Sequence, residues 1–148
     1  MSKNYDPPMH SAEHILNQTM VRMFNRGRSI NAHIEKKKSR IDYNIDRDLT
    51  AEEKLEIEKR VNDVINSNLN VTEEFISREE AERMFNLNKL PDDAGERIRI
   101  IRIGKYDACP CSGPHVSNTS EIGDFKILST SFENGFLRLR FKLDKTVS

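Results

Sequence analysis

Hydrophobic residues recur with helical spacing in two long stretches of the chain. Over residues 9–26, apolar side chains recur at positions i, i+1, i+4 and i+5. This spacing is typical of an amphipathic helix with one buried stripe. A second helix is expected over residues 50–67, because Thr50 and Glu53 form a capping box at its start. Its predicted buried stripe comprises Ile57, Val61, Val64 and Ile65.

A shorter helix is expected directly after residue 77. The sequence from Ser77 to Glu80 has the spacing of another capping box. The apolar positions that follow predict burial of Ala81, Met84 and Phe85. Residues 90–93, LPDD, are expected to form a loop.

The remaining stretches alternate hydrophobic and polar residues or are rich in isoleucine, as strands are. Residues 97–103 are expected to form a central strand because isoleucine dominates them. Asn134-Gly135 separates two further strand-like stretches and predicts a tight hairpin turn. Strands are therefore predicted over residues 40–46, 70–76, 97–103, 125–132 and 136–143.

These elements mix helices with hairpin-joined strands and contain no repeated β-α-β unit. We therefore predict an α+β fold with a largely antiparallel sheet packed with helices, and with both histidines of an HxxxH pair on the first helix. A chain of 148 residues is long enough for one compact domain and too short for two comfortable ones. We expect a single domain over residues 1–148.

Composition narrows the class of protein. Hydrophobic residues make up 36% and charged residues 32%, and no apolar run approaches the length of about 18 residues that a membrane span needs. The first ten residues lack the apolar core of a signal peptide. The two cysteines are separated by one residue, a spacing that strains a disulfide. We expect a cytoplasmic protein, in which clustered Cys and His more often bind metal or perform chemistry.

Charge is balanced overall but unevenly distributed. Residues 21–40 carry seven Lys or Arg and one acid, residues 41–96 carry seven bases and sixteen acids, and residues 97–148 carry nine bases and five acids. Such runs are compatible with a solvated surface or with a basic face that meets phosphate. The net charge of zero argues against tight, sequence-independent nucleic-acid binding, but it permits brief contact with one RNA end.

Candidate chemistry lies in two short stretches, HSAEH at residues 10–14 and CPCSGPHV at residues 109–116. His10 and His14 are four positions apart, so on a helix their rings share one face beside the apolar stripe. Cys111 and His115 are also four apart, and the Gly-Pro between them favours a tight turn that could bring both side chains to one point. Together the four side chains would suit Zn²⁺.

Residue spacing alone leaves this metal hypothesis open. Each half is also compatible with ordinary surface or core residues. Cys109 could replace Cys111, join it, or lie nearby without touching a metal ion. The CxC spacing matches CxxC redox motifs poorly, so a dithiol oxidoreductase is disfavoured.

Extended to HSAEHIL and CSGPHVSNTSEIG, the same stretches resemble the two signature halves of the second additional domain of threonyl- and alanyl-tRNA synthetases. This is the editing domain of those enzymes, and it also occurs in freestanding trans-editing proteins of the alanyl (AlaX) type. The resemblance runs from His10 to about Leu143. It includes residues 39–69, 77–85 and 90–93.

The resemblance implies a zinc ion held by His10, His14, Cys111 and His115. It also implies hydrolysis of the ester that joins a wrongly attached small amino acid, such as Ser, Gly or Ala, to the terminal ribose of tRNA. No part of the chain resembles an ATP-binding synthetase site, so we do not expect it to charge tRNA. One departure is notable: threonyl-type domains usually have Asp two residues before the zinc cysteine, where this chain has Cys109.

Several further residues could serve such a reaction. Candidates to orient water or a ribose hydroxyl are Asp107, Cys109, Thr119 and Ser11, although such residues more often have turn or capping roles. Phosphate contact with the aminoacylated 3′ end of tRNA is expected from the basic segment. Its candidate residues are Arg26, Arg28, Lys36, Lys37, Lys38 and Arg40. Neither DNA nor a membrane is expected as a partner.

Two alternatives to editing stay open at this level. A zinc-stabilised module could bind RNA or protein without hydrolytic activity, and the missing carboxylate at Cys109 keeps that interpretation open. A zinc hydrolase could instead act on another small ester or amide. Four protein ligands are typical of a closed structural ion, whereas a catalytic ion normally keeps one position open.

Overall fold

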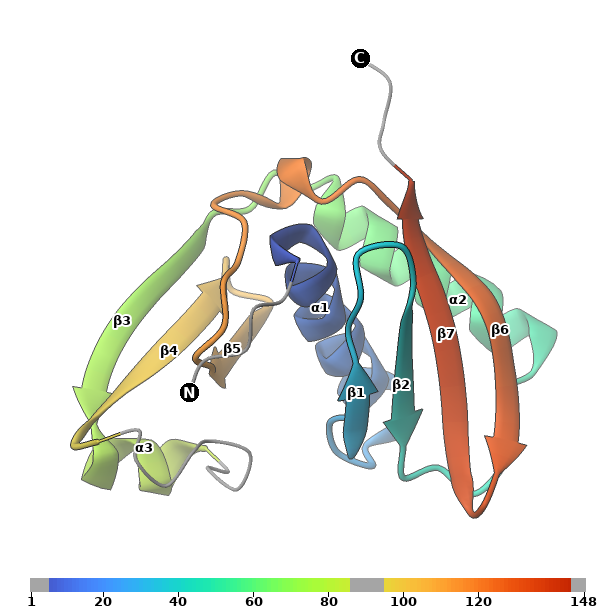
Figure 1. The fold of residues 1–148 in the computed structure, drawn as a ribbon, viewed down its shortest axis with the longest axis horizontal. Helices are drawn as coiled ribbons and strands as arrows, with labels where there is room; N and C mark the ends of the chain where they lie inside the picture. Colours follow the sequence, from blue (N-terminus) through green and yellow to red (C-terminus); the bar gives the residue numbers. More distant parts are fainter. Residues whose placement is uncertain (1–5, 86–94, 145–148) are drawn as a thin grey trace.

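The computed structural model describes residues 6–85 and 95–144, and in this part of the chain three helices accompany two antiparallel sheets (Figure 1). The α+β class and the HxxxH pair on the first helix are confirmed. The expected loop at residues 90–93 lies outside the described residues. No helix among residues 6–85 and 95–144 is long and apolar enough to cross a membrane.

The first helix, α1, spans Pro7–Phe24. Asp6 caps its start by accepting from the Met9 amide, and two prolines occupy the first turn, where their missing N–H groups cost nothing. Asn25 ends the helix in the left-handed conformation, slightly earlier than the stop predicted near residue 26. Most of α1 is buried, which places the polar residues of HSAEH inside the molecule.

The larger sheet has the strand order β1-β2-β7-β6, with every neighbouring pair antiparallel. The predicted Asn134-Gly135 hairpin joins its last two strands, and both turn residues have positive φ as a type I′ turn requires. The four strands are β1 (Asn31–His33), β2 (Ser39–Tyr43), β6 (Asp124–Glu133) and β7 (Phe136–Asp144).

The smaller sheet has the order β3-β4-β5 and stands on the other side of α1 (Figure 1). Its strands are β3 (Val71–Ser77), β4 (Arg97–Ile103) and β5 (Asp107–Pro110). The isoleucine-rich strand is central in this sheet, as predicted. The short strands β1 and β5 were not predicted, and β5 ends at Pro110, directly before the stretch from Cys111 to His115 that was interpreted as a tight turn. The single predicted sheet is therefore two sheets.

The second helix, α2 (Ala51–Ile65), has the predicted capping box and the predicted buried stripe. It packs with α1 against one face of the larger sheet, so that the main core lies between helices and strands. The third helix, α3 (Arg78–Met84), buries Ala81 against Ile98 and Ile100 of β4. A short 3-10 turn, η2, covers Thr119–Glu121.

Burial of Met84 was predicted and is wrong, since 55% of this residue is exposed. The helix ends at Met84, and the extended backbone of Phe85 turns that ring, rather than the methionine, toward the small cluster around Ala81. The second capping box is also only half formed: Ser77 accepts from the Glu80 amide, as an N-cap should.

Candidate metal centre

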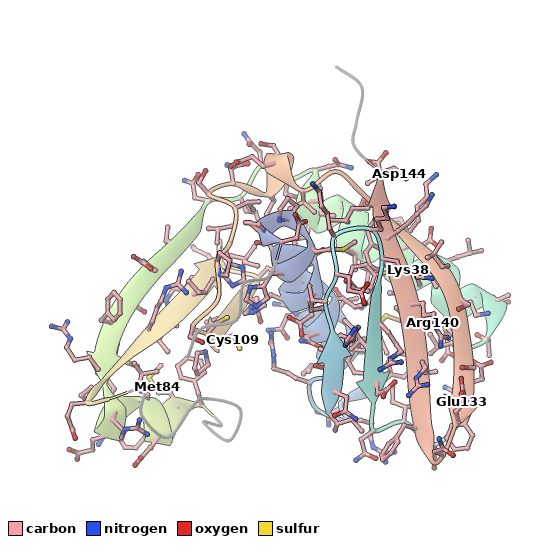
Figure 2. All side chains as sticks on the ribbon, in the orientation of Figure 1. Lys38, Met84, Cys109, Glu133, Arg140 and Asp144 are labelled. Carbon is pink, nitrogen blue, oxygen red and sulfur yellow. The ribbon has the colours of Figure 1, made fainter. Side chains whose placement is uncertain are left out.

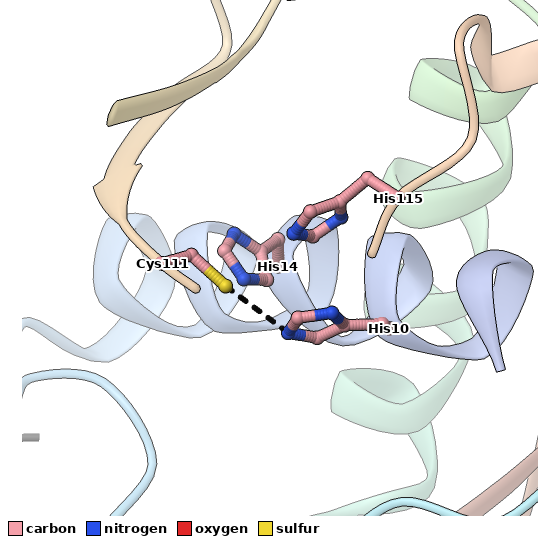
Figure 3. A group of neighbouring side chains, drawn as sticks. All are labelled: His10, His14, Cys111 and His115. Atoms are coloured by element: carbon pink, nitrogen blue, oxygen red, sulfur yellow. Dashed lines mark hydrogen bonds between the residues drawn. The ribbon is translucent and has the colours of Figure 1, made fainter. Parts of the chain in front are cut away.

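Four side chains from distant parts of the chain meet between α1 and the segment that follows β5. One possible ligand atom from each of His10, His14, Cys111 and His115 lies within 4.8 Å of the others (Figure 3). The two residues on α1 are 3% and 4% exposed. Such a group could hold a metal ion.

The helix supplies its half of the group through spacing alone. His10 and His14 are one turn apart, and their ring centroids are separated by 4.9 Å in an edge-to-face arrangement. His115 arrives from the opposite side and stacks on His10, with 4.1 Å between the centroids. Three imidazoles thus crowd around one small volume.

The second half reaches this volume because β4 anchors the turn after β5. The Arg99 guanidinium of β4 donates to the carbonyls of Cys111 and Gly113, at 3.2 and 2.7 Å. The Cys111 amide in turn donates to the Arg99 carbonyl. At Gly113 the backbone lies so close to α1 that an added Cβ would be 2.5 Å from His10 Cε1, so the approach requires glycine.

In two of the histidines, the ring nitrogen that points away from the group, here called the outer nitrogen, makes a hydrogen bond. His10 Nδ1 donates to the Pro114 carbonyl at 2.9 Å, which turns Nε2 toward Cys111 Sγ at 3.3 Å. His115 Nδ1 lies 2.9 Å from Ser11 Oγ, which also accepts from the Val116 amide. His115 Nε2 is buried and has no hydrogen-bond partner among residues 6–85 and 95–144. Outer-nitrogen bonds of this kind orient metal-binding histidines and fix their tautomers.

The third histidine faces a buried carboxylate. His14 Nδ1 lies 3.5 Å from Asp107 Oδ2, and the Arg28 guanidinium lies 2.8 Å from Asp107 Oδ1, which also accepts from Gln18. Burial alone would raise the pKa of Asp107, but the contacts with His14 and Arg28 outweigh it and lower that pKa to about 2. Asp107 is therefore a carboxylate that orients His14.

The electrostatics favour a thiolate at the centre of the group. Burial would raise the pKa of Cys111, but the close approach of the three histidines lowers it to about 3. Burial lowers the pKa of His115 to about 4, so this ring is neutral. For His14 burial acts downward too, but Asp107 and Cys111 raise the pKa to about 10, so that in the absence of a metal its ring holds a proton between two anions.

This donor set fits a metal ion of the zinc type. Neutral imidazoles and a thiolate are the ligands that Zn²⁺ prefers, and a cation here would replace the proton held by His14. The unpartnered His115 Nε2 is the kind of buried atom that a metal bond would satisfy. The four side chains therefore form a group that could hold a metal ion, called the metal-binding group below.

The other candidates near the group have different positions. Ser11 is fully buried and holds His115. Cys109 lies on β5 opposite Ile101, where burial raises the pKa of its thiol, and its Sγ contacts the Pro110 carbonyl. Thr119 is fully buried in η2 and accepts from the Leu69 amide, so its hydroxyl stabilises the turn that leads into β3.

The basic candidates divide into two groups. Arg28 turns inward to Asp107 and belongs to the surroundings of the metal-binding group. Arg26 is exposed just after α1, and Arg40 is exposed on β2. Lys36, Lys37 and Lys38 are exposed in the turn between β1 and β2.

One residue that the sequence analysis missed lies at the group itself. Glu13 is 8% exposed, its Oε1 lies 3.9 Å from His10 Nε2, and its Oε2 accepts from Asn17 at 3.4 Å. A signal was present, because HSAEH has the H-x-x-E-H pattern in which a helix presents two metal-binding histidines and a carboxylate together. Arg99 was also missed, because nothing local marks an arginine that anchors a turn.

Comparison with known proteins places the chain beside aminoacyl-tRNA synthetases. The model of the threonyl and alanyl tRNA synthetase second additional domain matches residues 98–138. The alanine–tRNA ligase of Neisseria meningitidis serogroup B (strain ATCC BAA-335 / MC58) is 32% identical over 134 residues, which cover 86% of this chain and 15% of that protein. The alanine–tRNA ligase of Methanocella arvoryzae is 35% identical over 144 residues, 94% of this chain and 16% of that protein.

A third alanine–tRNA ligase, from Coxiella burnetii (strain Dugway 5J108-111), is 34% identical over 123 residues, which cover 82% of this chain. The similarity thus includes both halves of the metal-binding group in the Methanocella comparison, which takes in nearly the whole chain. The chain spans about 15% of the length of these relatives.

Proposed function

The chain belongs to the threonyl and alanyl tRNA synthetase second additional domain family, and from this premise we propose that it hydrolyses mischarged aminoacyl-tRNA. The substrate is a small amino acid, such as Ser, Gly or Ala, esterified to a non-cognate tRNA. The reaction depends on zinc held by His10, His14, Cys111 and His115. It takes place in the cytoplasm, where aminoacyl-tRNA is used.

The observation that carries this proposal is the convergence of the four donor atoms within 4.8 Å. Two stretches about a hundred residues apart contribute two ligands each. A hydrogen bond from His10 to the Pro114 carbonyl joins them, and Arg99 holds the Gly113 carbonyl of the second stretch. A core that only needed stability would gain more from apolar residues at these buried positions, because burying polar groups is costly. The retained cluster therefore supports a chemical role.

The proposed reaction attacks an ester that is already activated. When bound, the ion supplies Lewis acidity toward water or the ester carbonyl. Glu13 Oε1 takes the proton of the attacking water as the water oxygen bonds to the carbonyl carbon. The bond from that carbon to the ribose oxygen then breaks, and the proton passes to this oxygen. The products are the free amino acid and tRNA with its terminal hydroxyl restored.

Glu13 favours hydrolysis over a purely structural ion. The position two residues before Cys111 lacks a carboxylate, which left a non-enzymatic binding module as the rival interpretation. Glu13 supplies a carboxylate from α1 instead, 3.9 Å from His10 Nε2. Burying a carboxylate beside a metal-binding histidine costs free energy of folding. A role in proton transfer would account for its presence there.

Removal of small amino acids is chemically reasonable for such a domain. A synthetase pocket cannot strongly exclude a substrate that is merely smaller than the correct one, so errors of this kind need a separate hydrolytic site.

A deacylation assay tests the proposal. Zinc-loaded protein is incubated with Ser-tRNA(Ala), Gly-tRNA(Ala), Ser-tRNA(Thr) and Ala-tRNA(Pro), and release of the amino acid is followed with time. We expect release from at least one substrate, and loss of both metal and release in His14→Ala. His33→Ala is the matched control, because His33 is exposed on β1.

No release above buffer from any of these tRNAs would contradict the proposal and favour the zinc-stabilised binding module. Equal turnover of a small amino-acid ester without tRNA would instead favour a general zinc hydrolase.

A further inference from the structure

The outer face of the larger sheet is strongly basic. Along β7 the residues Leu137, Leu139 and Phe141 are fully buried against the helices. The residues between them therefore point to the other side of the sheet, away from α1 and α2. We define the basic sheet face as Lys38, Arg40, Lys126, Arg138, Arg140 and Lys142, some of which are labelled in Figure 2.

The strand register places like charges directly opposite one another. Arg40 on β2 pairs with Arg140 on β7, and Lys126 on β6 pairs with Lys142 on β7. Because Ser39 pairs with Phe141, one step along the register brings Lys38 beside Lys142. The face thus presents a row of two arginines and a row of three lysines, about 7 Å apart along the strands.

These rows cost stability in the isolated protein. Like charges directly opposite on neighbouring strands repel each other. Neither Arg40 nor Arg140 forms an ion pair with a residue in the described ranges. Lys126 and Lys142 share a single acid, Asp144. Of this face, Arg138 alone has two acidic partners, Asp42 and Glu133.

The helix layer on the opposite side of the same sheet lacks this excess of positive charge. The helix α2, which packs behind β6, carries five carboxylates and three cations. The basic sheet face therefore carries more positive charge than the helix behind it, and such a difference orients a polyanion toward the basic side. The face has rows of charge rather than one pocket, which suits a ligand with repeating anionic groups.

We propose that the basic sheet face binds successive phosphates of the tRNA backbone while the acylated end enters the metal centre. This inference rests on the proposed function, from which the polyanion is RNA. The exposed lysines at 36–38 lengthen the face at one end of β2. Arg28, one of the basic candidates of the sequence analysis, is already engaged with Asp107.

Binding of uncharged tRNA, followed by fluorescence anisotropy over a range of salt concentrations, tests the inference with the full chain. The test variant is Arg40→Gln/Arg140→Gln, which removes two cations and leaves the Arg138 ion pairs in place. The control is Lys59→Gln/Arg60→Gln, which removes two exposed cations from α2. Circular dichroism and metal content confirm that both variants fold.

We expect the sheet variant to bind roughly 10-fold more weakly and to lower the slope of log affinity against log salt by about two, one for each lost phosphate contact. The α2 control should keep the wild-type slope. If wild type deacylates tRNA and the sheet variant binds like wild type, the inference fails and the proposed function stands. If wild type releases no amino acid, the proposed function fails. Competition by polyglutamate as strong as that by tRNA would assign the face to acidic polypeptides and overturn the inference.

Discussion

The backbone at Gly113 lies so close to the His10 ring that no room is left for a methyl group at residue 113. A Cβ at residue 113 would lie 2.5 Å from His10 Cε1 and 2.9 Å from His10 Nδ1. Arg99 holds the Gly113 carbonyl on one side, and the Pro114 carbonyl accepts from His10 on the other. Neither partner can move without breaking a hydrogen bond.

Gly113→Ala should therefore weaken metal binding by about 10- to 100-fold, the usual effect of disturbing residues that support metal ligands. The methyl group must displace either the His10 ring or the turn after β5. Competition with a chromophoric chelator measures the change in zinc affinity. Ser112→Ala, at the exposed neighbouring position, should retain wild-type affinity, and an unchanged affinity in Gly113→Ala would refute the close contact.

Ser11→Ala should weaken both the fold and the metal centre. The Ser11 hydroxyl accepts from the Val116 amide and contacts His115 Nδ1, so its loss leaves a buried amide without a partner and a ring without an anchor. We expect about 1–3 kcal/mol less free energy of unfolding and lower zinc affinity. Urea unfolding of the metal-free protein separates the two effects.

In Ser11→Thr the hydroxyl is retained, so this variant should recover most of the metal affinity. If Ser11→Ala also bound zinc with wild-type affinity, His115 would need no orienting partner.

Glu13→Gln should lower the rate of deacylation at saturating substrate by about 100-fold or more, the usual contribution of a general base, and leave KM little changed. The amide has the shape of the carboxylate and can still accept from Asn17, but it cannot take a proton from water. Zinc content should stay at the wild-type level. Glu79→Gln, on exposed α3, is the control.

Formate added to Glu13→Ala offers an independent readout, because a small carboxylate in the vacated space should restore part of the rate. Loss of zinc in Glu13→Gln would instead assign this residue to the support of the metal centre.

The stabilising effect of Glu53 should fade at low pH. Hydrogen bonds from Arg47 and Thr50 lower the pKa of this carboxyl from 4.5 to about 2. A carboxyl with a lowered folded-state pKa stabilises the fold when ionised, so its contribution is complete above about 4.5 and is lost as the pH falls through about 2.

Glu53→Gln should accordingly cost somewhat less than about 1 kcal/mol at neutral pH, since the Arg47 side chain is 51% exposed and solvent screens the pair, and progressively less in acid. Urea unfolding at several pH values measures the difference between variant and wild type. Glu52→Gln in the same helical turn is the control. A difference that grew as the pH fell would contradict the sign.

Regular elements with their own start and stop signals were predictable from the sequence. The capping box at Thr50 defined α2, and Asn134-Gly135 defined the hairpin of β6 and β7. By contrast, β1 and β5 have three and four residues, too few for alternation to show, and they exist because longer strands pair with them. The division into two sheets is likewise a property of long-range pairing.

The site shows the same division. Spacing alone put His10 and His14 on one helical face, but only the pairing of β5 with β4 shows how Cys111 and His115 reach them. The roles of Arg99 and Arg28 depend on contacts over 14 and 79 positions, which no local pattern encodes. The role of Glu13 could have been predicted, because residues 10–14 contain the whole H-x-x-E-H motif.

The separation of the two donor pairs along the chain has a consequence for biosynthesis. The helical pair is synthesised about a hundred residues before its partners, which the pairing of β5 with β4 helps to position. Before that pairing forms, only the imidazoles of His10 and His14 would be available to an ion. Tight metal binding by a newly made chain would therefore report that β5 has paired with β4.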